Sequence, residues 1–98
     1  MTKLKGEDFS PADRPTAKRI RRLVELQDFK CSMTGIPLEP EDANLDHIVP
    51  IAAGGDHVMS NVQVVHRVVN QMKSTLPADT FVDWCRKIVA FSDSQNDG

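Results

Sequence analysis

With 98 residues, the chain has room for one domain with a modest hydrophobic core. It is 40% hydrophobic and 27% charged, as in an ordinary globular protein, and it has no apolar run of the ~20 residues that a membrane-spanning helix needs. Residues 1–7 lack the apolar stretch of a secretory signal, so we expect a cytoplasmic protein with no membrane partner.

The net charge of −2 does not by itself favour nucleic acid as a ligand, but the basic residues are concentrated at one end. Residues 1–22 have a balance of +4, whereas residues 23–98 have a balance of −6. A basic run of this kind forms either a solvated face or a DNA-binding surface. The candidate DNA contacts in this run are Lys18, Arg19 and Arg22.

The first half of the chain predicts one helix. Residues 1–13 are polar and are expected to form a flexible lead-in. Pro15 suits a first helical turn, and the apolar spacing that follows predicts a helix over 14–27. Residues 29–37 contain a turn signal, and residues 36–44 are typical of a loop.

The middle of the chain predicts a hairpin followed by a helix. Residues 45–50 and 61–66 have the pattern of short strands, and the second is rich in β-branched side chains. The glycine-containing segment 52–56 is expected to be the loop between them, and a helix is predicted over 66–74.

A last helix is predicted over 77–91, followed by a polar, frayed tail over 92–98. Its apolar residues are expected to share one face, and they are Phe81, Trp84, Cys85, Ile88 and Val89. Together these elements predict an α+β domain over 14–91.

The residues best suited to chemistry lie in and after the first predicted strand. Asp46 and His47 are adjacent, so their side chains point to opposite faces of a strand. Asn70 offers an amide oxygen, which together with a carboxylate suits a hard cation such as Mg²⁺ or Mn²⁺. Imidazole can transfer protons near neutral pH. Phosphodiester hydrolysis uses such parts, although a lone Asp-His pair and a helical Asn are also common surface features.

The run Asp46-His47-Ile48-Val49-Pro50, followed by two glycines, Asn61, Asn70 and Lys73, resembles the HNH signature of the ββα-metal (His-Me finger) nucleases. The successive spacings from His47 are 14, 9 and 3 positions. They are similar to those of the HNH domain of RNA-guided CRISPR nucleases, which also reads Asp-His-Ile-Val-Pro. The resemblance covers residues 29–75 and implies a β-hairpin and a helix around a metal, flanked here by N- and C-terminal helices.

The resemblance also implies roles for single residues. His47 corresponds to the general base that activates water, and Asn61 to the central Asn that fixes the loop and orients the His ring. Asp46 and Asn70 correspond to the ligands of a divalent cation, Mg²⁺ or Mn²⁺. Cleavage of DNA is then expected to leave a 5′-phosphate and a 3′-hydroxyl.

For several neighbouring side chains the sequence leaves two interpretations open. Lys73 is either a phosphate contact or a solvated lysine, and Arg67 is either a DNA contact or part of a solvated face. His66 is either a packed histidine or a DNA contact, and His57 is expected to be a surface residue.

The sequence departs from the family at the positions where many members hold a structural zinc with two Cys-x-x-Cys pairs. Here those positions are Cys31 with Thr34 and His66 with Val69, which leaves two possible ligands and predicts no structural zinc. Cys31 and Cys85 are expected to be reduced core thiols. The flanking helices are expected to supply the packing that zinc supplies elsewhere.

The leading hypothesis is therefore a metal-dependent HNH endonuclease that acts on DNA. One alternative is a catalytically inactive HNH-like DNA-binding module, and another is a zinc-type interaction domain. The intact residues Asp46, His47, Asn61 and Asn70 argue against the first alternative, and the missing cysteines argue against the second. One small domain carries one site, so cutting both strands requires a homodimer or two successive nicks. A separate recognition partner is also compatible with so short a chain.

Overall fold

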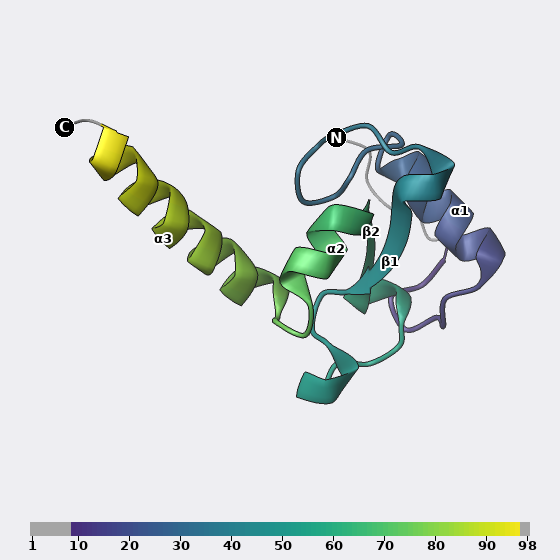
Figure 1. Cartoon of the computed structure of the whole chain (residues 1–98). Coiled ribbons are helices and arrows are strands. Elements are labelled where there is room, and N and C mark those ends of the chain that lie inside the picture. Colours follow the sequence, from purple (N-terminus) through teal and green to yellow (C-terminus); the bar gives the residue numbers. More distant parts are fainter. Residues whose placement is uncertain (1–8, 97–98) are drawn as a thin grey trace.

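The computed structural model describes residues 9–96, and in it the protein is a small α+β fold (Figure 1). Within that range, three α-helices accompany a two-stranded antiparallel sheet. In chain order the elements are α1 (Ala17–Leu26), β1 (Ala43–His47), β2 (Val62–His66), α2 (Arg67–Lys73) and α3 (Ala78–Asn96). None of these helices is both long and apolar enough to cross a bilayer.

The first helix is shorter than the predicted 14–27 because both of its ends are fixed by local structure. The hydroxyl of Thr16 accepts a hydrogen bond from the main-chain N–H of Arg19, which caps the first turn. Asp28 and Phe29 have φ angles of 56° and 57°, a left-handed conformation that a right-handed helix cannot continue through.

The predicted hairpin is confirmed, although β1 is displaced toward the N-terminus relative to the predicted 45–50. The register pairs Asp46 with Gln63 and His47 with Val62. The chain leaves β1 before Pro50 and turns through a short 3₁₀ segment, Ile51–Ala53. α2 follows β2 directly and packs against both strands. Its last turn therefore lies beside the end of β1.

A small core joins the N-terminal segment to the sheet. Phe9, Met59 and Val62 are buried together, and Leu23, Leu26 and Leu45 pack against them. The carbonyl oxygen of Asp13 also accepts a hydrogen bond from the main-chain N–H of Met59. The predicted flexible lead-in is therefore wrong for residues 9–13, and the rest of it, residues 1–8, lies outside the described residues.

The side chain of Gln27, at the C-terminal end of α1, is hydrogen-bonded to the edge of β2 that does not pair with β1. The amide nitrogen of Gln27 donates to the carbonyl oxygen of Val64, and its amide oxygen accepts from the Val64 N–H. The Val64 carbonyl accepts a second hydrogen bond from the main-chain N–H of Ser32. Gln27 therefore pairs with Val64 in the way that a residue of a third strand would.

The last helix differs most from its prediction. It continues to Asn96, so the predicted frayed tail is wrong for 92–96, and residues 97–98 lie outside the described residues. The helix projects from the body, and Phe81 is its one buried residue (Figure 1). Trp84, Ile88 and Val89 are each more than half exposed, so the expected packing of this apolar face against the core is absent from the described part of the chain.

Candidate functional site

Three of the predicted site residues lie around one depression. Asp46 and His47 at the end of β1 and Asn70 on α2 line a pocket of about 320 Å³. The turn after β1 and the end of α2 complete its wall, through Pro50, Ile51, Ala52, Ser74 and Thr75. The hairpin and the helix thus bring together two segments that lie more than twenty positions apart in the chain.

The side chain of His47 is held by a second histidine. Its Nε2 atom lies 2.8 Å from Nδ1 of His57, and the two ring centroids are 5.1 Å apart. His57 was expected to be a surface residue, yet it is only partly exposed and contacts the candidate base. No sequence pattern indicates this contact, because His57 belongs to a loop whose path depends on the fold.

This contact decides which nitrogen of His47 remains for chemistry. One of the two facing nitrogens must carry the shared proton, since two lone pairs cannot form a hydrogen bond. When His47 donates from Nε2, its Nδ1 atom is left with a free lone pair. In that tautomer Nδ1 is the atom that can accept a proton from water.

Asn61 connects the loop after β1 to the start of β2. Its amide oxygen accepts from the main-chain N–H of Val49, and its amide nitrogen donates to the carbonyl oxygens of Val49 and Asp56. Gly55 lies under this connection, where a Cβ atom would overlap the Val49 carbonyl and crowd the Asn61 amide. Glycine is therefore required at position 55 by a close approach of two backbone segments.

Asp46 is more deeply enclosed than a surface metal ligand would be. It is 5% exposed, its Oδ1 atom accepts from Nζ of Lys73 at 3.1 Å, and its Oδ2 atom accepts from the Gln63 amide at 3.0 Å. Gln63 in turn accepts a hydrogen bond from the hydroxyl of Ser32. Sequence reasoning singled out neither Gln63 nor Ser32, since a polar residue in an alternating strand carries no distinctive signal.

Lys73 differs from both of its sequence-based interpretations. It has no exposed surface, and its ammonium group donates to Asp46 and to the main-chain carbonyl of His47. A fully buried ammonium group is neither a solvated lysine nor positioned to contact a phosphate on the surface. The structure instead makes Lys73 the internal counter-ion of Asp46.

The oxygen donors around the pocket fit a hard cation in part. Mg²⁺ commonly uses one or two protein ligands and completes its shell with water and substrate oxygens, so one carboxylate and one amide oxygen are sufficient. Asp46 and Asn70 line the same pocket, but Lys73 and Gln63 already use the carboxylate oxygens. A cation held here has to share or displace one of those hydrogen bonds. In residues 9–96 no three His, Cys, Asp or Glu side chains converge as a further metal site.

Cys31, one of the two possible zinc ligands considered from the sequence, is an enclosed thiol. Cys31 is almost completely buried. Burial raises the pKa of its thiol, but hydrogen bonds from the Thr34 hydroxyl and from the main-chain N–H groups of His66, Met33 and Thr34 outweigh this, so the pKa lies below its ordinary value. Cys85, expected in the core, is only partly buried, and both cysteines are free thiols.

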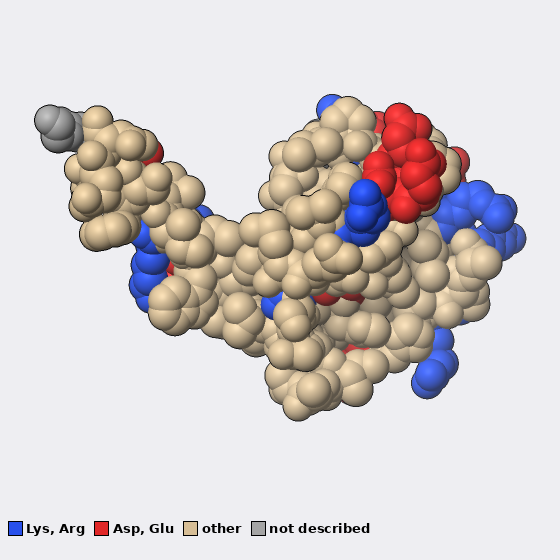
Figure 2. All heavy atoms as spheres, viewed as in Figure 1, with Lys and Arg blue, Asp and Glu red and all other residues tan. Residues whose placement is uncertain are grey.

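The candidate DNA contacts lie on other parts of the surface. Lys18, Arg19 and Arg22 are on α1, at the right of Figure 2, where blue side chains gather. Arg19 is in addition paired with Asp13 at 3.6 Å.

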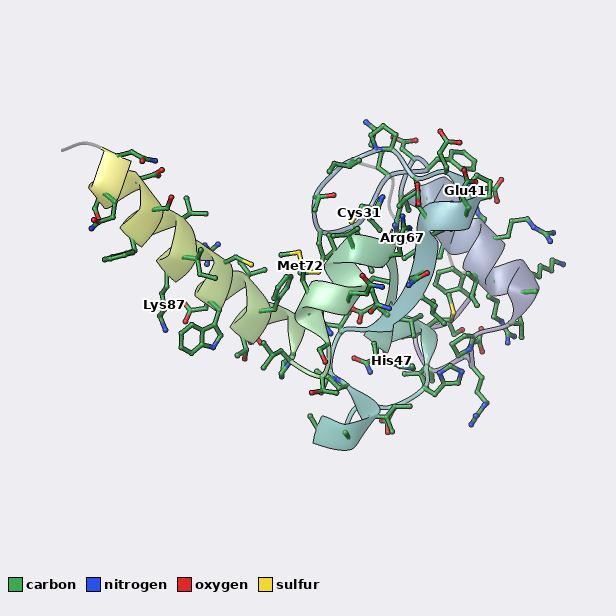
Figure 3. All side chains as sticks on the ribbon, in the orientation of Figure 1. Cys31, Glu41, His47, Arg67, Met72 and Lys87 are labelled. Atoms are coloured by element: carbon green, nitrogen blue, oxygen red, sulfur yellow. The ribbon has the colours of Figure 1, made fainter. Side chains whose placement is uncertain are left out.

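His66 and Arg67, at the start of α2, both lie close to the carboxylate of Asp42. Arg67 is exposed and lies 3.0 Å from Asp42, beside the acidic group at the top of Figure 2. His66 lies 3.6 Å from the same carboxylate and caps α2 through Nδ1, which accepts from the Val68 N–H. The labelled side chains of Arg67 and His47 lie at different ends of the sheet (Figure 3).

Comparisons with protein-family models, with curated proteins and with solved structures found no match to this chain.

Proposed function

We propose that this protein is a metal-dependent endonuclease of the HNH type that hydrolyses phosphodiester bonds in DNA. The observation that carries the proposal is the meeting of Asp46, His47 and Asn70 around one pocket. These are the residues that the HNH-like spacing selects, and β1, β2 and α2 supply the hairpin and helix expected of a ββα-metal finger.

In the proposed reaction, Nδ1 of His47 accepts a proton from the water that attacks phosphorus. The bond between phosphorus and the 3′-oxygen breaks, and that oxygen leaves as a 3′-hydroxyl with a proton from solvent, while the 5′-phosphate stays on the other fragment. His57 supports this role because its hydrogen bond fixes the ring and directs the opposite nitrogen away from itself. Asn61 acts at a distance, since it holds the loop from Val49 to Asp56, which leads to His57.

Asp46 and Asn70 would hold the divalent cation, which when bound supplies positive charge for the developing negative charge on the phosphate. Lys73 holds the Asp46 carboxylate in position by pairing with it. DNA is the proposed substrate because the basic side chains Lys18, Arg19 and Arg22 on α1 offer phosphate contacts.

The test is cleavage of supercoiled plasmid by the full chain in the presence of Mg²⁺ or Mn²⁺. We expect nicked or linear product, its loss in EDTA, and its recovery when the cation is restored. His47→Ala is the matched control, because it should abolish cleavage while retaining the circular dichroism spectrum and the DNA affinity. Equal cleavage by His47→Ala, or full activity in EDTA, would contradict the mechanism.

A second candidate function is a DNA-binding module without catalysis. It is favoured because both carboxylate oxygens of Asp46 already accept hydrogen bonds from protein side chains, one from Lys73 and one from Gln63. This candidate predicts salt-dependent DNA binding with no cleavage under any divalent cation. The plasmid assay combined with a binding assay on the same sample separates the two functions.

A further inference from the structure

The projecting helix α3 has no sufficient partner within the described chain. It spans 19 residues, of which Phe81 alone is buried. Most helices in proteins are stabilised by packing an apolar face rather than by helix propensity alone. Ile88, Val89 and Phe91 are each more than half exposed, so most of the apolar surface of this helix is uncovered in the described part of the chain.

The apolar side chains of α3 lie on two opposite sides of the helix. At 100° per residue, Val82, Arg86, Val89 and Asp93 form one stripe, with spacings of four, three and four positions. Trp84, Ile88 and Phe91 lie on the far side, where they border a shallower pocket.

The first stripe faces a groove between α3 and the body of the protein. The groove has a volume of about 670 Å³, and the body contributes Met33, Val69 and Met72 to its wall. Met72 is 60% exposed and lies where α2 approaches the base of α3 (Figure 3). In the space-filling view the molecule is hollowed between this arm and the body (Figure 2).

We propose that α3 of a second copy of the chain fills this groove, and that the two α3 helices pack antiparallel about a twofold axis beside Val89 and Ala90. The charges on the stripe support this occupant. Arg86 and Asp93 lie equally far on either side of the Val89–Ala90 bond, so an antiparallel pair brings each Arg86 opposite Asp93 of the partner subunit. Within residues 9–96 neither side chain has an ion-pair partner of its own.

This arrangement also covers the wall of the groove. A helix in the groove has the neighbouring α3 on one side and the body, with Met33 and Met72, on the other. The stripe centred on Val89 meets its symmetry mate. Because the two helices run antiparallel about the Val89–Ala90 bond, the last turn of the partner's α3 lies level with Cys85 and covers the exposed Met72 at the base of the groove.

The proposal does not depend on nuclease activity, and its readout is molecular mass. Sedimentation equilibrium of the full chain at micromolar and near-millimolar concentrations should show a monomer–dimer equilibrium. Arg86→Glu and Asp93→Arg should each weaken the dimer by about tenfold or more, because each places like charges opposite one another. The double variant with both reversals restores opposite charges and should recover most of the lost affinity.

Arg21→Glu is the matched control, because it makes the same change of charge on the exposed surface of α1. It should leave the dimer unchanged, and circular dichroism should show that all variants remain folded. A wild-type monomer at near-millimolar concentration overturns the proposal. A dimer that withstands both single reversals, or one that the double reversal does not recover, assigns the contact to another surface and also overturns it.

Discussion

Nζ of Lys73 lies 3.1 Å from Oδ1 of Asp46, and this is an ion pair between a side chain with no exposed surface and one that is 5% exposed. The pair is linked to the main chain of β1 through the His47 carbonyl, to which Lys73 also donates. Removal of either partner leaves a charge in an apolar environment, and breaking a buried pair in this way typically costs about 3–5 kcal/mol.

We therefore expect Lys73→Met and Asp46→Leu each to lower the free energy of unfolding by about 3–5 kcal/mol, measured by urea denaturation. The double variant should lose less than the sum of the two, because it leaves no unpaired charge. Lys87→Met changes an exposed lysine on α3 and should shift stability by about 0.5 kcal/mol or less. Additive single effects would show that the two side chains are not coupled.

The two histidines should respond differently to substitution. His47→Ala removes the proposed base and should lower the single-turnover cleavage rate by ~100-fold or more. His57→Ala leaves that base in place but frees its ring, so a smaller loss is expected, with little change in DNA affinity. His57→Asn retains a hydrogen-bonding side chain and should recover part of the loss. An inactive His57→Ala beside an active His47→Ala would mean that the roles are reversed.

The loop after β1 should be sensitive to the space at Gly55. Gly55→Ala places a methyl group against the Val49 carbonyl and should destabilise the protein clearly, with a lower midpoint of thermal unfolding. Gly35→Ala is the control, since nothing lies within 4 Å of its added Cβ and only the positive φ of 75° is strained. A smaller effect at Gly55 than at Gly35 would show that the loop rearranges freely.

Asn61→Ala removes three hydrogen bonds that join Val49 and Asp56. Because water can replace partners at these exposed positions, we expect a loss of about 0.5–1.5 kcal/mol in the free energy of unfolding. Under the proposed function, the cleavage rate should also fall, since His57 follows Asp56 directly. Hydrogen exchange at Val49 offers a local measure, because its N–H loses its acceptor. Unchanged protection of the Val49 N–H from exchange would contradict the inference that Asn61 holds this loop in place.

Salt dependence tests the basic face of α1. If Lys18 neutralises a DNA phosphate, Lys18→Gln should reduce the slope of log affinity against log salt by about 0.9. Arg19→Gln should have a smaller effect, since Arg19 already pairs with Asp13. Fluorescence anisotropy over a salt series measures both slopes, and Lys87→Gln on α3 is the control. An unchanged slope for Lys18→Gln would indicate that the basic side chains of α1 form a solvated face and do not contact DNA.

Local patterns in the sequence were sufficient to predict the hairpin and the helix that follows it. β-branched residues before His66 and glycines in the preceding loop determine those elements at short range, so β2 and α2 lie within a residue of their predicted bounds. The spacing of the HNH-like motif also selected Asp46, His47 and Asn70, which line one pocket.

Features that depend on contacts between distant segments were not predictable. The sequence predicts a phosphate contact or a solvated side chain for Lys73, and only the position of β1 against α2 supplies Asp46 as its counter-ion. The apolar spacing of α3 correctly indicated a helix, but periodicity does not state whether the face is covered by the same chain. Phe9 was missed for a related reason, since one aromatic residue in a polar segment has no periodicity.

The attachment of Gln27 to Val64 has a consequence for association between folded chains. A two-stranded sheet has exposed edges, and an edge with free N–H and C=O groups is a template for adding strands from other molecules. β2 is apolar enough to be such a template, yet at Val64 both main-chain groups are taken by Gln27 and Ser32. This side-chain amide thus protects the middle of β2 from intermolecular strand addition, a first step toward aggregation.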